Sequence, residues 1–94
     1  MLFAVSCKDK PGGFELRMQT REKHLGFIRG LGGQVQMAGP FLSEDGSEMI
    51  GSLLILEADD RMAAEAIAAQ DPYAQAGLFE SVEIVPWKLA FNNM

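Results

Sequence analysis

Two residues have side chains suited to proton transfer: His24, the single histidine of the chain, and Asp71. Asp71 precedes Pro72, and a proline disfavours helical backbone angles in the residue before it. Asp71 therefore lies at a junction between elements, where its carboxylate can be held in one direction. A carboxylate that accepts a hydrogen bond from one ring nitrogen of a histidine leaves the other nitrogen free to take or give a proton. Spacing alone leaves two interpretations open: an acid/base pair, or a structural His24 and an Asp71 that bonds only a nearby backbone N–H.

Two arginines precede His24 on the same predicted helix. Arg17, Arg21 and His24 follow one another at spacings of four and three residues, which places them in one inclined row. A buried cation needs a partner or a polar cavity, because burying it alone is costly. The row indicates a pocket for an anionic or oxygen-rich ligand. The alternative is an arginine at the edge of the helix that extends its charged end to solvent or pairs with a structural carboxylate such as Asp9, Glu57 or Glu22.

Other kinds of site find little support. The chain contains no serine nucleophile elbow, no phosphate-binding loop and no dinucleotide fingerprint. Its single cysteine, Cys7, excludes an internal disulfide and a multi-cysteine zinc site, and it is expected to be a small buried hydrophobe. Haem ligation by His24 is a third hypothesis that no other residue supports. We therefore expect no metal and no cofactor.

The composition restricts the partners and the compartment. The chain has 94 residues, 48% of them hydrophobic, and a formal net charge of −5. This length predicts a single domain over residues 1–94. The negative charge argues against nucleic acid and anionic membranes as partners, since both favour a basic face. The sequence shows neither a signal-peptide pattern nor an apolar run long enough to span a membrane, so a cytoplasmic location is expected.

The hydrophobic pattern predicts the order β-α-β-β-α-β. Gly39 and Pro40 should close or bend the second strand, and Asp59 should cap the second helix. This order is typical of an α+β, ferredoxin-like fold. It has a four-stranded antiparallel sheet, strands one and three in the centre, and two helices on one face. The predicted ranges are Leu2–Cys7, Phe14–Leu31, Gln34–Ala38, Met49–Leu56, Asp60–Gln70 and Leu78–Trp87.

Both faces of this sheet would be apolar, whereas the two helices can cover only one. The uncovered face is expected to carry Phe3, Val5, Leu53, Ile55 and Trp87. A surface of this kind favours a homodimer in which two sheets pack face to face.

Several short segments form an ordered set along the chain: Arg21–Leu25, Ala38–Phe41, Asp45-Gly46 leading to Gly51-Ser52, Asp71–Tyr73, Gly77–Phe79 and Val85–Trp87. Taken in this order, they resemble the YciI-like (YCII-related) family of the dimeric α/β-barrel superfamily. The resemblance runs over nearly the whole chain. It implies the ferredoxin-like dimer described above, and an active site in which a His–Asp pair lies in a pocket, at His24 and Asp71.

Together these observations predict a small-molecule enzyme. His24 would act as base or acid and Asp71 would orient it, in a proton abstraction, isomerisation or elimination on a hydroxylated or carboxylated cyclic or aromatic compound. Arg21 and Arg17 would hold an anionic group of the substrate, and Ser52 would donate a hydrogen bond. The alternative is a non-catalytic ligand-binding or structural dimer.

Overall fold

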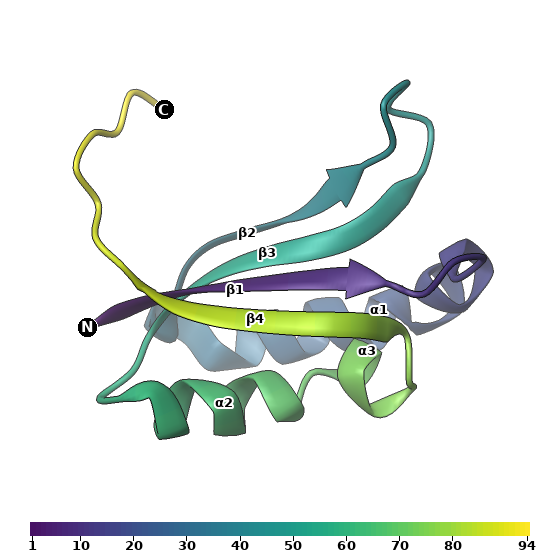
Figure 1. Cartoon of the computed structure of the whole chain (residues 1–94). Coiled ribbons are helices and arrows are strands. Elements are labelled where there is room, and N and C mark those ends of the chain that lie inside the picture. Colours follow the sequence, from purple (N-terminus) through teal and green to yellow (C-terminus); the bar gives the residue numbers. More distant parts are fainter.

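A four-stranded antiparallel sheet with its helices packed against one face forms the body of the computed structural model, which describes residues 1–94 (Figure 1). The strands lie in the order β2-β3-β1-β4, so β1 and β3 are central, and the predicted ferredoxin-like fold is confirmed. The strands are β1 (Leu2–Asp9), β2 (Val35–Leu42), β3 (Met49–Glu57) and β4 (Phe79–Trp87). The helices are α1 (Phe14–Leu31), the 3₁₀ turn η1 (Gly32–Gln34), α2 (Arg61–Ala69) and the one-turn α3 (Pro72–Gln75).

Two strands extend two or more residues further than their sequence patterns predict. Strand β1 continues two residues past Cys7 to Asp9, and β2 continues through Gly39 and Pro40 to Leu42. A proline inside a strand removes one hydrogen-bond donor, which an edge strand tolerates. Because β2 is an edge strand that pairs only with β3, Pro40 interrupts no hydrogen bond between the central strands, and β2 continues past it.

The second helix is capped by Asp60, where the prediction named Asp59. The Asp60 carboxylate accepts a hydrogen bond of 2.8 Å from the backbone N–H of Ala63, two residues after the helix begins at Arg61. Helix α3 was not predicted. It starts with Pro72 at its first position, and Gly77 follows its end with a φ of +77°, a left-handed angle that favours glycine.

The core lies between the helices and one face of the sheet. The assignment of Phe3 and Val5 to the uncovered face is wrong: both are 1% exposed and pair with Leu56 and Leu54 beneath the helices. Leu2 and Ala4 take the opposite face instead. The error arose because both alternating sets of β1 are apolar, so the period of two does not reveal which set faces the helices.

The sheet face opposite the helices, here called the outer face, still carries exposed apolar side chains. Ile55 is buried by its neighbours there, whereas Trp87 remains 37% exposed. The residues of the C-terminal segment after β4 rise on this side of the sheet in Figure 1. The other exposed apolar residues of the outer face, by register with β1 and β3, are Met37, Phe41 and Val85.

None of the helices combines the length and the hydropathy needed to cross a membrane.

Candidate active site

His24 and Asp71 are in direct contact. His24 projects from the middle of α1, and Asp71 immediately precedes α3. The distance from His24 Nδ1 to Asp71 Oδ1 is 2.9 Å, and both residues are buried. Asp71 Oδ1 also accepts a 2.9 Å hydrogen bond from the backbone N–H of Tyr73. Asp71 thus does both things that the sequence left open: it caps a helix and it partners the histidine.

This arrangement defines the tautomer of His24. A carboxylate accepts hydrogen bonds, so the nitrogen that faces it, Nδ1, carries the proton and donates. The other nitrogen, Nε2, then has an unshared electron pair. His24 can therefore accept a proton at Nε2 while Asp71 holds the ring in place.

Tyr73, which the sequence did not single out as a site residue, lies against the histidine ring. The two rings stack with centroids 4.1 Å apart and an angle of 16° between their planes. Burial raises the pKa of the Tyr73 phenol above its ordinary value, and the charges of Arg17 and Arg21 oppose this rise. Tyr73 is the only tyrosine of the chain and stands two residues after Asp71. This position near Asp71 was the sequence signal that could have identified Tyr73 as a site residue.

Arg17 is bound by a structural carboxylate. Its Nε donates to Asp9 Oδ2 at 2.7 Å and its Nη2 donates to Asp9 Oδ1 at 2.9 Å. Nη2 also donates to Ser52 Oγ at 2.8 Å, and the guanidinium carbon lies 4.4 Å from the centre of the Tyr73 ring. Burial by itself lowers the pKa of Arg17, but the hydrogen bonds and the charge of Asp9 outweigh burial and raise it above its ordinary value. Arg17 therefore fixes Ser52 and Tyr73 in position.

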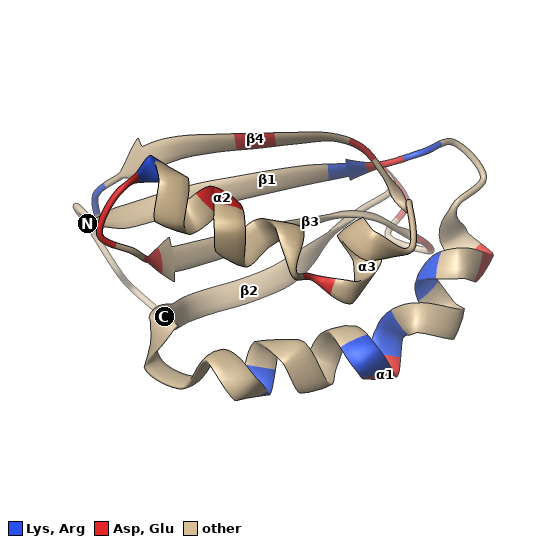
Figure 2. Cartoon of the chain, turned by 90° about the horizontal axis from the view of Figure 1, so that it is seen from below, with Lys and Arg blue, Asp and Glu red and all other residues tan.

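Arg21 lies one helical turn after Arg17 and is exposed. Its side chain makes no hydrogen bond or ion pair with another residue of the chain. Figure 2 shows basic residues at intervals along α1, together with acidic ones, and further basic residues on β1 and at the start of α2. Arg21 is thus the cation of this row that remains available to an anionic group.

A cavity of about 210 Å³, here called the front cavity, joins these side chains. It lies between α1 and strands β2 and β3. Four of the five residues that the sequence nominated line it, and the fifth, Asp71, stands behind His24 and outside its wall. The lining side chains are Arg17, Arg21, His24, Leu25, Ile28, Met49, Ser52, Leu53, Leu54 and Tyr73, with Ala38, Gly39 and Pro40 of β2.

No group of three or more His, Cys, Asp or Glu residues is placed to hold a metal ion. The polar side chains that line the front cavity are the imidazole of His24, the hydroxyls of Ser52 and Tyr73, and the guanidinium groups of Arg17 and Arg21. That set suits hydrogen bonding and proton transfer on an oxygen-bearing molecule.

The chain is similar in sequence to proteins of one family. The YCII-related domain matches residues 1–88. Protein YciI of Escherichia coli O6:H1 is 34% identical over 98 residues, which cover 97% of this chain and all of that protein. An uncharacterized protein of Haemophilus influenzae matches with the same identity and coverage.

Solved structures agree. The 5-chloro-2-hydroxyhydroquinone dehydrochlorinase (TftG) of Burkholderia phenoliruptrix AC1100, in complex with 2,5-dihydroxybenzoquinone, superposes with a TM-score of 0.87. It is 33% identical, and 96% of each chain is covered. An antibiotic biosynthesis monooxygenase superposes with a TM-score of 0.56 at 14% identity over 96% of this chain and 99% of that one, which shows a shared fold alone.

Proposed function

Because the chain belongs to the YCII-related domain family, we propose that it is a small-molecule enzyme in which His24 and Asp71 transfer protons on a hydroxylated six-membered ring. The observation that carries this proposal is the 2.9 Å hydrogen bond between the buried His24 and Asp71 side chains, at the wall of the front cavity. The similar dehydrochlorinase acts on a hydroxyhydroquinone, which supports the class of substrate.

The proposed chemistry begins at His24 Nε2. This nitrogen takes a proton from a ring hydroxyl, and Asp71 stabilises the imidazolium that forms. On a chlorinated hydroxyhydroquinone, loss of HCl requires one hydroxyl proton to reach the ring carbon that bears chlorine. A second hydroxyl proton then leaves with the chloride ion, and the ring becomes a quinone. A residue that both takes and returns protons serves each transfer, and no oxidant is needed.

The remaining polar residues of the front cavity have separate roles in this proposal. Arg21 stabilises the negative charge that develops on the ring oxygen. Ser52 Oγ accepts from Arg17, so its own hydroxyl proton can be donated to a second ring oxygen. Arg17 is a positioning residue, because Asp9, Ser52 and Tyr73 already occupy its guanidinium.

The test is replacement of His24. We expect His24→Ala to lower kcat for chloride release from 5-chloro-2-hydroxyhydroquinone by about 10²–10⁴-fold, the usual contribution of a proton-transfer residue. Gln19→Ala, on the exposed face of the same helix, is the matched control and should retain full activity. Exchange of ring hydrogens of hydroxyhydroquinone with D₂O provides a second measurement that needs no chlorine.

Unchanged turnover in His24→Ala would exclude the mechanism. Binding of these rings by the unaltered protein without turnover or hydrogen exchange would instead identify a non-catalytic ligand-binding protein. In that case Asp71→Asn should reduce the free energy of unfolding more than it reduces ligand affinity.

We also propose that two copies of the chain associate through the outer face of the sheet. Met37, Phe41, Val85 and Trp87 present exposed apolar side chains there, between 37% and 49% exposed. Contiguous apolar surface on a small protein is commonly an interaction site. A twofold dimer would cover this surface with an identical one.

A further inference from the structure

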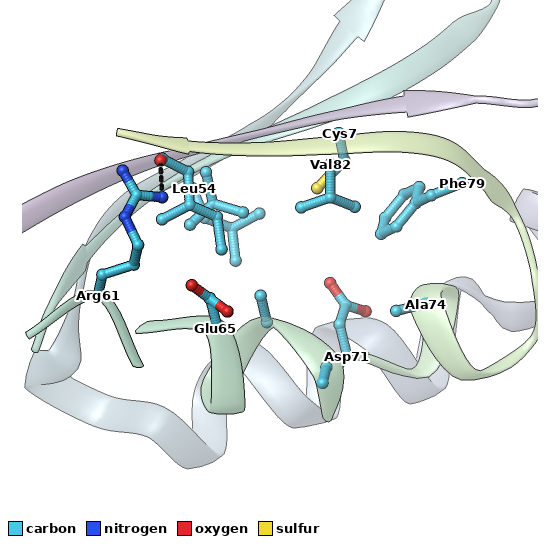
Figure 3. A pocket seen from close by; sticks show the side chains of 12 residues that line it. Cys7, Leu54, Arg61, Glu65, Asp71, Ala74, Phe79 and Val82 are labelled. Carbon is cyan, nitrogen blue, oxygen red and sulfur yellow. Dashed lines mark hydrogen bonds between the residues drawn. The ribbon is translucent and has the colours of Figure 1, made fainter. Parts of the chain in front are cut away.

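A second and larger cavity, here called the rear cavity, lies on the other side of Asp71. Its volume is about 400 Å³, and it lies between the helix side of β1 and β4 and the helices α2 and α3 (Figure 3). Nine of its twelve lining residues are hydrophobic, among them Val5, Phe79, Val82 and Ile84. Binding sites for small molecules commonly measure about 300–1,000 Å³. The rear cavity falls within that range, and the front cavity, at about 210 Å³, does not.

Asp71 presents an unpartnered oxygen to the rear cavity. Its side chain is only 3% exposed. Both hydrogen bonds that the carboxylate accepts, from His24 and from the backbone of Tyr73, end on Oδ1. No residue of the chain donates to Oδ2, and Figure 3 shows the carboxylate aimed into the rear cavity. Because no buried side-chain oxygen lacks a partner, Oδ2 is accessible at the surface of the rear cavity, where a ligand hydroxyl can donate to it.

The other groups around the rear cavity restrict the charge of its ligand. Cys7 projects from β1 into the cavity opposite Asp71 (Figure 3), and its thiol is neutral because burial raises its pKa to about 12, with the charge of Asp71 as the next cause. Arg61 and Glu65 lie at one end, and the Arg61 guanidinium donates to the backbone oxygen of Ile84. The carboxylates of Asp71 and Glu65 outnumber the one guanidinium of Arg61, so the charge around the rear cavity disfavours an anionic ligand.

We propose that the rear cavity binds a neutral, largely apolar alcohol or phenol that donates one hydrogen bond to Asp71 Oδ2. The apolar wall contacts the body of the ligand, and Asp71 selects its hydroxyl group. Since Asp71 also holds His24, an occupant of the rear cavity is coupled to the imidazole without touching it. This site does not depend on His24 being catalytic.

The test compares three ligands of one shape: 4-butylphenol, butylbenzene and 4-butylbenzoate. Binding is followed by NMR through the methyl signals of Val82 and the imidazole signals of His24, which are unambiguous because the chain has one histidine. We expect 4-butylphenol to move both sets of signals with one saturation curve. Butylbenzene, which has no donor for the buried carboxylate, should bind at least tenfold more weakly. The benzoate should bind more weakly still.

A pair of variants on α2 locates the bound ligand. Ala68 lines the rear cavity, whereas Ala66, two residues earlier on the same helix, is exposed. Ala68→Phe should weaken 4-butylphenol binding at least tenfold, and Ala66→Phe should leave it unchanged. Equal binding of butylbenzene and 4-butylphenol to the unaltered protein would overturn the proposal, even if Ala68→Phe failed to fold. Equal affinity in the two folded variants, or no binding of the phenol, would overturn it as well.

These results are independent of the proposed reaction. If His24→Ala left turnover unchanged, the acid/base mechanism would be rejected, whereas the binding measured at the rear cavity would still hold. If 4-butylphenol failed to bind, the proposed ligand site in the rear cavity would be rejected, whereas the proposed role of His24 in turnover would be unaffected.

Discussion

Arg17 illustrates how a long cationic side chain is accommodated in a small core. It is 2% exposed, yet Asp9 neutralises its charge through two hydrogen bonds, and Ser52 accepts a third. No buried side-chain nitrogen or oxygen of the chain lacks a hydrogen-bond partner. Buried ion pairs of this kind are sensitive to the loss of one member, because the other charge is then left alone.

The ion pair leads to a prediction on stability. We expect Arg17→Met to lower the free energy of unfolding by about 3–5 kcal/mol, since Asp9 is left buried and uncompensated. The double variant Arg17→Met with Asp9→Leu should recover a large part of this loss, because no charge then remains buried. Urea denaturation of the original protein, both single variants and the double variant gives the free energies of unfolding for a double-mutant cycle. Strictly additive losses would show that the two side chains do not interact.

Cys7 leads to a prediction on pH. Burial raises the pKa of its thiol from 9.0 to about 12. The folded chain therefore keeps this proton between about pH 9 and 12, whereas the unfolded chain loses it. The contribution of this thiol to the free energy of unfolding is therefore fully present below pH 9. It decreases as the pH rises from 9 to 12, by up to about 4 kcal/mol at 1.36 kcal/mol per pH unit. Cys7→Ala should flatten the alkaline decline in urea denaturation, and an equally steep decline in that variant would contradict the assignment.

At the scale of elements, the starts of two short helices determine the positions of two aspartate side chains, Asp60 and Asp71. Helix α2 begins at a side-chain cap, and two residues separate the end of α2 from the start of α3. In both cases an aspartate accepts from a backbone N–H at the helix start, which satisfies a donor that the helix itself leaves unpaired. At α3 the same carboxylate oxygen also faces His24. The cap and the proposed active site therefore share one residue.

The cap of α2 can be tested without disturbing that site. We expect Asp60→Ala to lower the free energy of unfolding by about 0.5–2 kcal/mol, because the N–H of Ala63 loses its partner. Asp59→Ala is the matched control, since this neighbouring aspartate is exposed and makes no such hydrogen bond, and it should change stability little. A larger loss in Asp59→Ala, measured by thermal or urea unfolding, would reassign the cap to the residue that the sequence suggested.

At the scale of the whole molecule, the sheet separates two surfaces with different roles. The helix side holds the front and rear cavities, with Asp71 between them. The outer face carries the exposed apolar side chains. A dimer built on the outer face would thus leave the helix side of each copy open to ligands.

Two valines of β4 distinguish the faces. Val85 is 49% exposed on the outer face, and Val82 is 43% exposed on the helix side. We expect Val85→Lys to shift the protein from dimer to monomer in sedimentation velocity, because it places a charge in an apolar interface. Val82→Lys introduces the same charge on the same strand and should leave a dimer. Dissociation by Val82→Lys alone, or a monomeric unaltered protein, would contradict an interface on the outer face.

The sequence determined the element order, the helix Phe14–Leu31 and the identity of the central strands. These follow from local causes: apolar periodicity, and glycines and prolines at the turns. Its resemblance to the YCII-related family also directed attention to His24 and Asp71.

Only the tertiary structure decided which residues meet. His24 and Asp71 are 47 positions apart, and Arg17 and Ser52 are 35 apart, so their contacts depend on how α1 packs beside α3 and over the sheet. No periodicity within a segment contains that information. The same holds for the face taken by Phe3 and Val5, because a strand with two apolar sides is oriented only by the elements that cover it. The second cavity behind Asp71 likewise exists only once α2, α3 and β4 enclose it.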